Sequence, residues 1–233
     1  MDKEFGKLSV FDKIYAESYW GNGSGGGSSL EANRPYIQFI DNFINKFSIS
    51  SIIDLGCGDW QFSKFINFGK ADYLGIDVAK SIIKSNSSKY SNEKVSFMHS
   101  PNNYEEIPEA DLLICKDVLM HLNYDEILKI SKIFPKYKYC LITNDLLNLS
   151  QLGKLILRFK ARKLKLVEEI YNQEIKIGEH RPLDLNKKPF CFKLKKVFEW
   201  DAMPLSTSEI LNWKNLILGR KSVWKKRTYL YER

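Results

Sequence analysis

The chain has 233 residues, a formal net charge of +8 and a hydrophobic content of 44%, which together fit one globular domain with a substantial core. It contains no run of about 18 uninterrupted apolar residues, and its N-terminus, MDKEFGKLSV, lacks the apolar centre of a signal peptide. We therefore expect no membrane span and a cytoplasmic protein. The positive charge is concentrated in the C-terminal half, which indicates either an anionic partner or lysines on solvated faces.

The N-terminal region contains a glycine- and serine-rich stretch, WGNGSGGGSSLEAN, at residues 20–33. Its composition is that of a flexible linker, but the aromatic residues before it, from Phe11 to Trp20, favour a short helix that packs against the domain. The stretch also has the glycine spacing of a phosphate-binding loop. Such a loop requires a preceding strand and a lysine where the chain has Gly27. The stretch is therefore not predicted to be a phosphate-binding loop.

Apolar residues at helical spacing over 30–47 predict a helix, with Ser28 or Ser29 as its N-terminal cap. Farther along the chain, short apolar runs that end in turn residues alternate with helical segments. We expect strands at 51–55, 72–77, 95–99, 110–116 and 138–145, and helices at 60–67, 79–90 and 123–134. Continuous apolar strands that alternate with helices are typical of a parallel sheet covered on both faces.

The pattern changes after residue 145. We expect a helix over 148–170, a loop at 178–190, strands at 192–200 and 222–232, and a helix at 207–218 between these strands. The two late strands are predicted to form an antiparallel edge of the sheet. Residues 1–233 should thus form a single α/β domain. Within it, residues 1–48 hold the N-terminal helical segment and the glycine-rich stretch, and residues 146–190 form an insertion on the substrate side.

Four cysteines stand at positions 57, 115, 140 and 191, and their spacing is not that of a metal site. We expect reduced, buried thiols, with Cys115, Cys140 and Cys191 in strands. The histidines, aspartates and asparagines form no recognisable metal spacing either, so no metal site is predicted.

The segment IIDLGCGDW, at 52–60, places a glycine-rich turn directly after a strand. Gly56 and Gly58 allow a sharp turn and a close approach to a ligand. A dinucleotide fingerprint requires a third glycine or alanine where the chain has Gln61. Asp54, at the tip of the strand, disfavours a pyrophosphate and favours a cationic group. Asp77, at the end of the next strand, can accept both hydroxyls of a ribose. S-adenosylmethionine meets these requirements.

At these residues the sequence resembles the class I S-adenosylmethionine-dependent methyltransferases. DLGCG at 54–58 is similar to their first motif and GID at 75–77 to their second. EADLLICKDVLMHL at 109–122 resembles their fourth-strand segment, in which the residues after the strand face the sulfur and the methyl group. The resemblance implies a Rossmann-like fold with a mostly parallel seven-stranded sheet, helices on both faces and an antiparallel C-terminal edge. It also implies S-adenosylmethionine as the cofactor and S-adenosylhomocysteine as its product.

We expect the glycine-rich stretch to act as a mobile lid that closes over the amino-acid end of the cofactor, where its hydroxyls and amides bind the carboxylate. If its mobility is the same with cofactor bound, it is only a tether. Ser100 stands where the family often has an acid that binds the adenine. The expected cofactor site comprises Trp20, Ser24, Gly25, Ser28, Asp54, Gly56, Gly58, Trp60, Asp77, Val78, Ser100, Cys115, Lys116 and Asp117.

Several segments between about residues 11 and 190 resemble a bacterial subgroup that is found with surface-polysaccharide biosynthesis. They are IYAESYWGNGSGGGSSLEANRPY, DLGCGDWQFSKF, CKDVLMHL, LITND and GEHRPLDLNKKPF. This resemblance implies a small anionic or sugar-type acceptor, a precursor of a capsule or another surface glycan. Methylation of an oxygen is favoured, because only a hydroxyl needs a base to remove its proton.

The candidate bases are His121 and Asp145, which the topology places at the carboxyl ends of strands. His121 could instead be a core or capping histidine, and Asp145 could cap a helix. Asn144, His180 and Arg181 are expected to contact the acceptor, since a guanidinium suits a phosphate or carboxylate. The loop that holds His180 and Arg181 could alternatively anchor the sheet edge.

Two other functions remain open at this point. The net charge of +8 would suit RNA or protein methylation, although the amino-methylating N/D-P-P-F/Y/W motif is replaced by CKDV after the fourth strand. Alternatively, the chain is a binding module that holds the cofactor without catalysis. The intact Asp54, Gly56, Gly58 and Asp77 argue against that second alternative.

Overall fold

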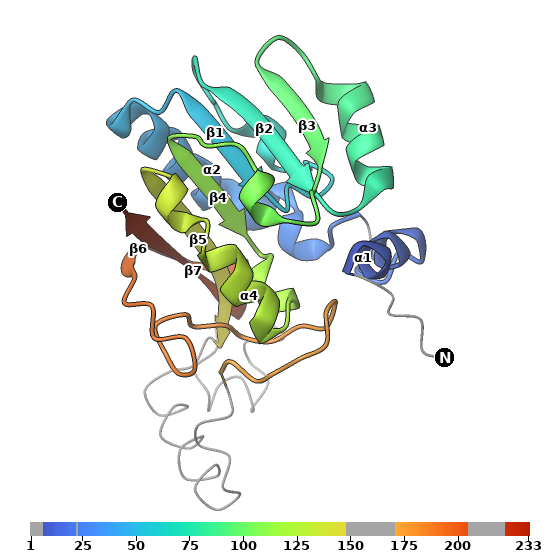
Figure 1. The fold of residues 1–233 in the computed structure, drawn as a ribbon, viewed down its shortest axis with the longest axis vertical. Helices are drawn as coiled ribbons and strands as arrows, with labels where there is room; N and C mark the ends of the chain where they lie inside the picture. Colours follow the sequence, from blue (N-terminus) through green and yellow to red (C-terminus); the bar gives the residue numbers. More distant parts are fainter. Residues whose placement is uncertain (1–6, 22, 148–170, 205–221) are drawn as a thin grey trace, which may run out of the picture.

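The computed structural model describes residues 7–21, 23–147, 171–204 and 222–233. In this part of the chain a seven-stranded sheet has the order β3-β2-β1-β4-β5-β7-β6 (Figure 1). The parallel strands are β1 (Ser51–Leu55), β2 (Asp72–Asp77), β3 (Val95–His99), β4 (Leu112–Lys116) and β5 (Tyr139–Leu147). Strand β7 (Ser222–Glu232) lies between β5 and the edge strand β6 (Lys195–Pro204), and it is antiparallel to both.

Helices cover both faces of the sheet (Figure 1), and α-helices occur in the connections from the second to the third parallel strand and from the fourth to the fifth. The α-helices are α1 (Lys7–Ala16), α2 (Leu30–Phe47), α3 (Lys80–Tyr90) and α4 (Tyr124–Ser131). Short 3-10 turns are η1 (Gly26–Ser28), η2 (Ser63–Phe65), η3 (Tyr104–Glu106), η4 (Leu119–His121) and η5 (Phe134–Lys136). Among the described residues, no helix is long and apolar enough to cross a membrane.

The apolar strands supply two hydrophobic clusters, one on each face of the sheet. Ile52 and Leu112 pack in the cluster that contains the buried face of α2, whereas their neighbours Ile53 and Leu113 pack in the cluster that contains α4. Successive side chains of a strand point to opposite faces, so a continuous apolar run is what a sheet covered on both faces requires.

Helix α2 connects the N-terminal region to the far edge of the sheet. Ser29 caps the helix, and its hydroxyl accepts a hydrogen bond from the Ala32 amide at 3.3 Å. The indole of Trp200 on β6 donates to the Ala32 carbonyl at 2.8 Å, and its ring stacks on Tyr36 at 5.2 Å. The beginning of α2 is therefore fixed from both sides, which holds the glycine-rich stretch before it near the centre of the sheet.

The sequence-based strands all occur, with small shifts at their ends. The prediction of a helix at 60–67 was wrong. Trp60 has a φ of 60°, which a right-handed helix does not allow, and only η2 forms there. Helix α4 ends at Ser131, and the chain continues into η5, which contains Pro135. Cys191 is exposed and lies before β6, whereas the other three thiols are buried as expected. The helices expected at 148–170 and 207–218 lie outside the described residues.

Candidate active site

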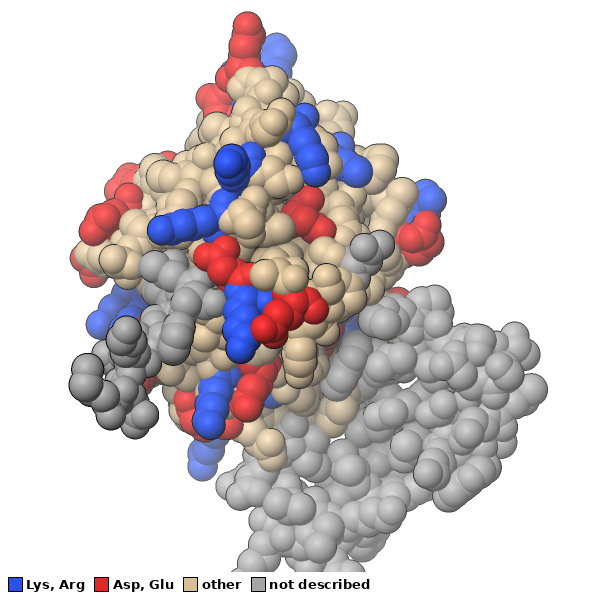
Figure 2. Space-filling model, turned by 90° about the vertical axis from the view of Figure 1, so that its right-hand side faces the viewer, with Lys and Arg blue, Asp and Glu red and all other residues tan. Residues whose placement is uncertain are grey.

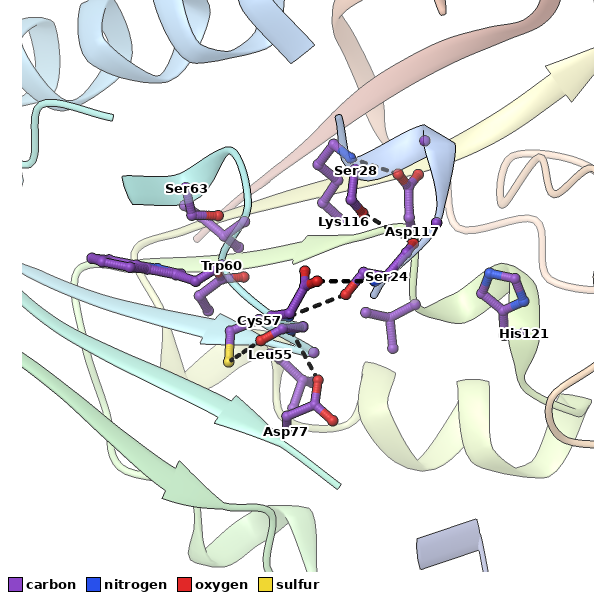
Figure 3. Close-up of a pocket in the computed structure, with 18 of the residues that line it drawn as sticks. Ser24, Ser28, Leu55, Cys57, Trp60, Ser63, Asp77, Lys116, Asp117 and His121 are labelled. Carbon is purple, nitrogen blue, oxygen red and sulfur yellow. Dashed lines mark hydrogen bonds and ion pairs between the residues drawn. The ribbon is translucent and has the colours of Figure 1, made fainter. Parts of the chain in front are cut away.

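A cavity of about 340 Å³ lies at the carboxyl ends of the parallel strands (Figure 3). This is the end of an open parallel sheet at which ligands bind, because the loops that leave the strands diverge there. The walls of the cavity come from the turn after β1, the ends of β2, β4 and β5, and the glycine-rich stretch before α2.

The glycine turn after β1 forms one side of the cavity, and only glycine fits it. Gly56 and Gly58 have φ values of 79° and 55°. A Cβ atom at Gly56 would lie 2.2 Å from Val118 Cγ2, and one at Gly58 would lie 2.5 Å from the Ser24 hydroxyl oxygen. The amides of Gly56 and Cys57 both donate to the Ile76 carbonyl, at 2.7 and 3.1 Å. The turn is therefore tied to β2 in one conformation.

The carboxylate of Asp77, at the end of β2, holds this turn from the other side. One oxygen accepts a hydrogen bond from the Gly58 amide at 3.0 Å, and the other accepts one from the Ala79 amide at 2.9 Å. Burial raises the pKa of Asp77, and the hydrogen bonds from backbone amides oppose that change. Asp77 thus has a structural contact with the first motif in addition to its position on the cavity wall.

Asp54 ends a chain of buried hydrogen bonds. The Trp60 indole donates to the Tyr73 hydroxyl at 2.9 Å, and this hydroxyl donates to Asp54 at 2.7 Å. Burial raises the pKa of Asp54 to about 6, although Tyr73 and Lys116 lower it. Within the described chain Asp54 forms no ion pair. A cation in the cavity would therefore stabilise its ionised form.

The glycine-rich stretch lies across the glycine turn and is fixed to it at Ser24 (Figure 3). The Ser24 amide donates to the Asp59 carboxylate, and the Asp59 amide donates to the Ser24 hydroxyl, both at 3.1 Å. The hydroxyl of Tyr15 on α1 lies 2.8 Å from the same Ser24 oxygen. We call this arrangement of Tyr15, Ser24 and Asp59 the serine latch.

Four charged side chains form a buried network in the cavity wall, close to Gly27 of the glycine-rich stretch. The ammonium group of Lys226, from β7, lies 2.8 Å from Asp117 and 2.7 Å from Asp145. The ammonium group of Lys116 lies 2.5 Å from the same Asp117 oxygen. Burial opposes the charge of Lys226, but its two carboxylate partners raise its pKa. Burial likewise opposes the charge of Asp145, but Lys226 and His180 lower the pKa of Asp145 well below its usual range.

Two imidazoles lie beside this charged network. His180 Nε2 lies 3.2 Å from the second oxygen of Asp145. His121 Nδ1 lies 2.9 Å from the Glu179 carbonyl oxygen, and its ring lies 5.0 Å from that of Trp20 and 5.5 Å from that of His180. Desolvation by the surrounding protein lowers the pKa of His121 to about 4.

The structure brings together all but three of the predicted site residues. The residues that line the cavity are Trp20, Ser24, Gly25, Ser28, Asp54, Gly56, Gly58, Trp60, Asp77, Val78, Ser100, Lys116, Asp117, His121, Asp145 and His180. Cys115 lies in the hydrophobic cluster on the α4 face, outside the cavity lining. Asn144 and Arg181 are also outside the lining and are only 1% and 2% exposed, with the Arg181 guanidinium 5.6 Å from the centre of the Tyr124 ring.

Sequence reasoning missed three residues of the site, Tyr15, Asp59 and Lys226, which also line the cavity. Lys226 stands in the run KKR of a strand whose alternation was recognised. Successive side chains of a strand point to opposite faces of the sheet, so one of two neighbouring lysines must face the interior of the protein. This rule could have predicted a buried lysine in the run. Asp59 follows the glycine turn directly, but its partner Ser24 is distant in sequence, so no local pattern indicates their contact.

No family model matches the chain, and no curated protein sequence matches it. Among solved structures, it is similar to magnesium protoporphyrin IX methyltransferase from Synechocystis PCC 6803, which was crystallised with bound S-adenosylhomocysteine. The TM-score is 0.56 at 15% identity, over 98% of this chain and 100% of that chain. It is also similar to an S-adenosylmethionine-dependent methyltransferase from Anabaena variabilis, with a TM-score of 0.57 at 12% identity, over 100% and 97%.

A third similar structure is the N-methyltransferase NodS from Bradyrhizobium japonicum, in complex with S-adenosylhomocysteine. Its TM-score is 0.51 at 11% identity, over 87% of each chain. These similarities confirm the predicted Rossmann-like class I methyltransferase fold. At such low identity they concern the fold alone.

The state of Asp54 gives a testable stability prediction. Its pKa is raised from 3.8 to about 6 in the folded protein, so its contribution to stability is complete below about pH 4 and is lost as the pH rises through about 6. Asp54→Asn removes this loss and keeps an acceptor for Tyr73. The difference in unfolding free energy between the cofactor-free variant and wild type should therefore change with pH. It should shift in favour of the variant by up to about 3 kcal/mol from about pH 4 to pH 7.

The measurement is urea unfolding at several pH values, with Asp201→Asn as the control, because Asp201 lies on β6 and outside the cavity lining. Parallel curves for wild type and Asp54→Asn over this pH range would contradict the raised pKa.

Proposed function

We propose that the chain is an S-adenosylmethionine-dependent methyltransferase. The observation that carries this proposal is a cavity in which a glycine turn lies between two buried carboxylates, Asp54 and Asp77. Asp54 would face the cationic amino-acid end of the cofactor, since its charge has no ion-pair partner among the described residues. Asp77 would accept the ribose hydroxyls. The similarity in fold to methyltransferases with bound S-adenosylhomocysteine supports this assignment.

Other residues of the lining fit the remaining parts of this cofactor. The glycine turn allows close approach along the backbone of Gly56 and Gly58. Val78 and Ser100, which follow β2 and β3, are proposed to contact the adenine. Ser24, Gly25 and Ser28 are proposed to bind the carboxylate, with Trp20 beside them. When bound, S-adenosylmethionine supplies a sulfonium methyl group, so that a new bond to the acceptor forms as the carbon–sulfur bond breaks and its electron pair stays on sulfur.

The charges of the cavity favour an uncharged acceptor. Its lining includes five aspartates but only two lysines, and both lysines are paired with Asp117 or Asp145. An anionic acceptor would meet a surplus of carboxylates, whereas a sugar hydroxyl would find hydrogen-bond acceptors and the Trp20 ring. We therefore propose O-methylation of a neutral, sugar-type precursor of a surface polysaccharide. The polysaccharide assignment depends on the resemblance of the sequence to the bacterial subgroup.

Arg181 and Asn144 are less suited to acceptor binding than their residue types indicate. The nitrogens of the Arg181 guanidinium and both polar atoms of the Asn144 amide are buried, and neither side chain belongs to the cavity lining. His180, by contrast, lies on that lining. We therefore propose that the part of the insertion that begins at residue 171 contributes His180 to the acceptor site.

RNA methylation remains the second candidate, and the net charge of +8 favours it. On the face shown in Figure 2, however, Lys and Arg side chains are interspersed with Asp and Glu. A nucleic-acid surface would instead present a continuous basic stripe along the phosphates. A binding module without catalysis is the third candidate. Thermal stabilisation by S-adenosylhomocysteine without turnover of any acceptor would favour it.

Calorimetry with S-adenosylmethionine tests the cofactor assignment. Wild type should bind, and Asp77→Ala should lose at least about 100-fold in affinity, because two charge-assisted hydrogen bonds contribute about 1.5 kcal/mol or more each. Asp72→Ala is the matched control, since Asp72 stands at the opposite end of the same strand, exposed and paired with Lys94. Unchanged affinity in Asp77→Ala would contradict the ribose assignment.

Hydrogen exchange tests whether the glycine-rich stretch is a lid. Amides at residues 23–29 should exchange at least about tenfold more slowly when S-adenosylmethionine is bound, because cofactor contacts would add to the serine latch. Equal exchange rates with and without cofactor would identify the stretch as a tether.

Transfer of a tritiated methyl group tests the acceptor class. The acceptors are neutral methyl glycosides, nucleotide sugars and a transcribed RNA, each at low and high salt. We expect label on the hydroxyls of a sugar acceptor. Salt-dependent labelling of the RNA alone would favour the second candidate.

A further inference from the structure

The backbone amide of Ser24 already has a carboxylate as its partner. It donates to Asp59 Oδ2 at 3.1 Å, and the Gln61 side-chain amide donates to the same oxygen at 2.7 Å. Ser24 is one of the residues that are proposed to bind the carboxylate of the cofactor. A backbone amide has a single hydrogen to donate, so a ligand can use the Ser24 amide only in place of Asp59.

The chain at Gly23 leaves room for this carboxylate. The φ of Gly23 is 61°, and a Cβ atom there would lie 1.8 Å from Asp59 Oδ2 and 2.6 Å from Gln61 Nε2. A side chain at position 23 would therefore fill the place of the carboxylate oxygen, and glycine keeps that place open. Because Ser24 and Asp59 both line the cavity, this carboxylate subsite belongs to the cavity wall.

A second carboxylate beside Asp59 would find no cation of the protein. None of the ion pairs among the described residues includes Asp59. The two lysines of the lining are paired with Asp117 and Asp145 instead. Two carboxylates that share a site repel each other. Exchange of one carboxylate for the other is therefore favoured over a site that holds both.

We propose that the Asp59 side chain is an internal competitor for the carboxylate of the cofactor. This proposal rests on the proposed function. Without cofactor, Asp59 holds the Ser24 amide; on binding, the ligand's carboxylate takes this amide and the Asp59 side chain turns away. The contacts of the Ser24 hydroxyl with the Asp59 amide and with Tyr15 remain, so the serine latch keeps the stretch in place. The affinity for the cofactor is lowered in proportion to the fraction of molecules in which Asp59 occupies the subsite.

The first test is calorimetry with S-adenosylhomocysteine and with methylthioadenosine, which shares the nucleoside thioether but lacks the amino-acid end. Asp59→Ala should raise the affinity for S-adenosylhomocysteine at least about fivefold, because the competitor is gone. Its affinity for methylthioadenosine should stay within about twofold of wild type, because this ligand has no carboxylate. Asp59→Asn keeps an acceptor for the Ser24 amide without the negative charge, so it should show a smaller gain in the same direction.

Asp72→Ala is the control, since it removes an exposed aspartate from the opposite end of β2 and should change neither affinity. An unchanged or lower affinity of Asp59→Ala for S-adenosylhomocysteine would overturn the proposal. A loss would mean that Asp59 attracts the ammonium group of the ligand or supports its site. An equal gain for methylthioadenosine would also overturn it, because the carboxylate would then have no part in the effect.

The second test follows hydrogen exchange of the Ser24 amide itself. Without ligand, this amide should exchange at least about tenfold faster in Asp59→Ala than in wild type, because its acceptor is gone. With saturating S-adenosylhomocysteine, the two proteins should exchange at the same rate within about twofold, because the ligand's carboxylate is then the acceptor in both. Equal rates in the two ligand-free proteins, or a persistent difference with ligand, would contradict the exchange of carboxylates.

These two tests separate the failure of this proposal from the failure of the proposed function. If wild type binds neither S-adenosylmethionine nor S-adenosylhomocysteine, the methyltransferase assignment fails, and the competition fails with it. Exchange in the ligand-free proteins would then still decide whether Asp59 holds the Ser24 amide. If wild type binds both ligands but Asp59→Ala gains no affinity, the assignment stands and Asp59 is only a structural part of the serine latch.

Discussion

The buried ammonium group of Lys226 is the interaction on which the charged network in the cavity wall depends. It comes from β7, the antiparallel strand inserted beside β5, and it joins carboxylates at the ends of β4 and β5. Removal of one member of such a buried ion pair lowers the folding stability by about 3 to 5 kcal/mol, because the remaining charge is neither paired nor hydrated. The same ammonium favours the ionised form of Asp145, whose other oxygen lies 3.2 Å from His180 Nε2. A single side chain of β7 therefore links the topology of the sheet to the charges of the cavity wall.

The glycine-turn side of the cavity is organised by hydrogen bonds and by local backbone strain rather than by ion pairs. Trp60, which follows the glycine turn, lines the cavity and has a positive φ of 60°. A non-glycine residue in this region costs about 1 to 3 kcal/mol, and such strain is concentrated at functional sites. The uncompensated carboxylate of Asp54 adds to this cost in the protein without cofactor. The strained backbone and the unpaired carboxylate thus lower the folding stability of the protein. A cationic ligand that binds beside Asp54 would restore part of this loss.

The sequence predicted the sheet well because its evidence is local: apolar runs, turn residues and the glycine motif. It predicted individual side chains less well where two neighbouring residues point in opposite directions. Lys116 faces the cavity, so its neighbour Cys115 on the same strand faces the core. In the same way, Asp145 lines the cavity and Asn144 does not. Lys226 and Asp59 were missed because their partners come from distant segments, and only the folded chain brings those segments together.

Gly58 has a consequence for how this site can vary among related proteins. A Cβ atom at this position would lie 2.5 Å from the Ser24 hydroxyl oxygen and 3.4 Å from the Tyr15 hydroxyl oxygen, so the glycine leaves room for the serine latch as well as for a ligand. A larger residue at 58 would displace Ser24 from Asp59. Positions 24, 58 and 59 are therefore constrained to change as a set. A relative that has lost the serine at 24 is released from one of the reasons to keep glycine at 58.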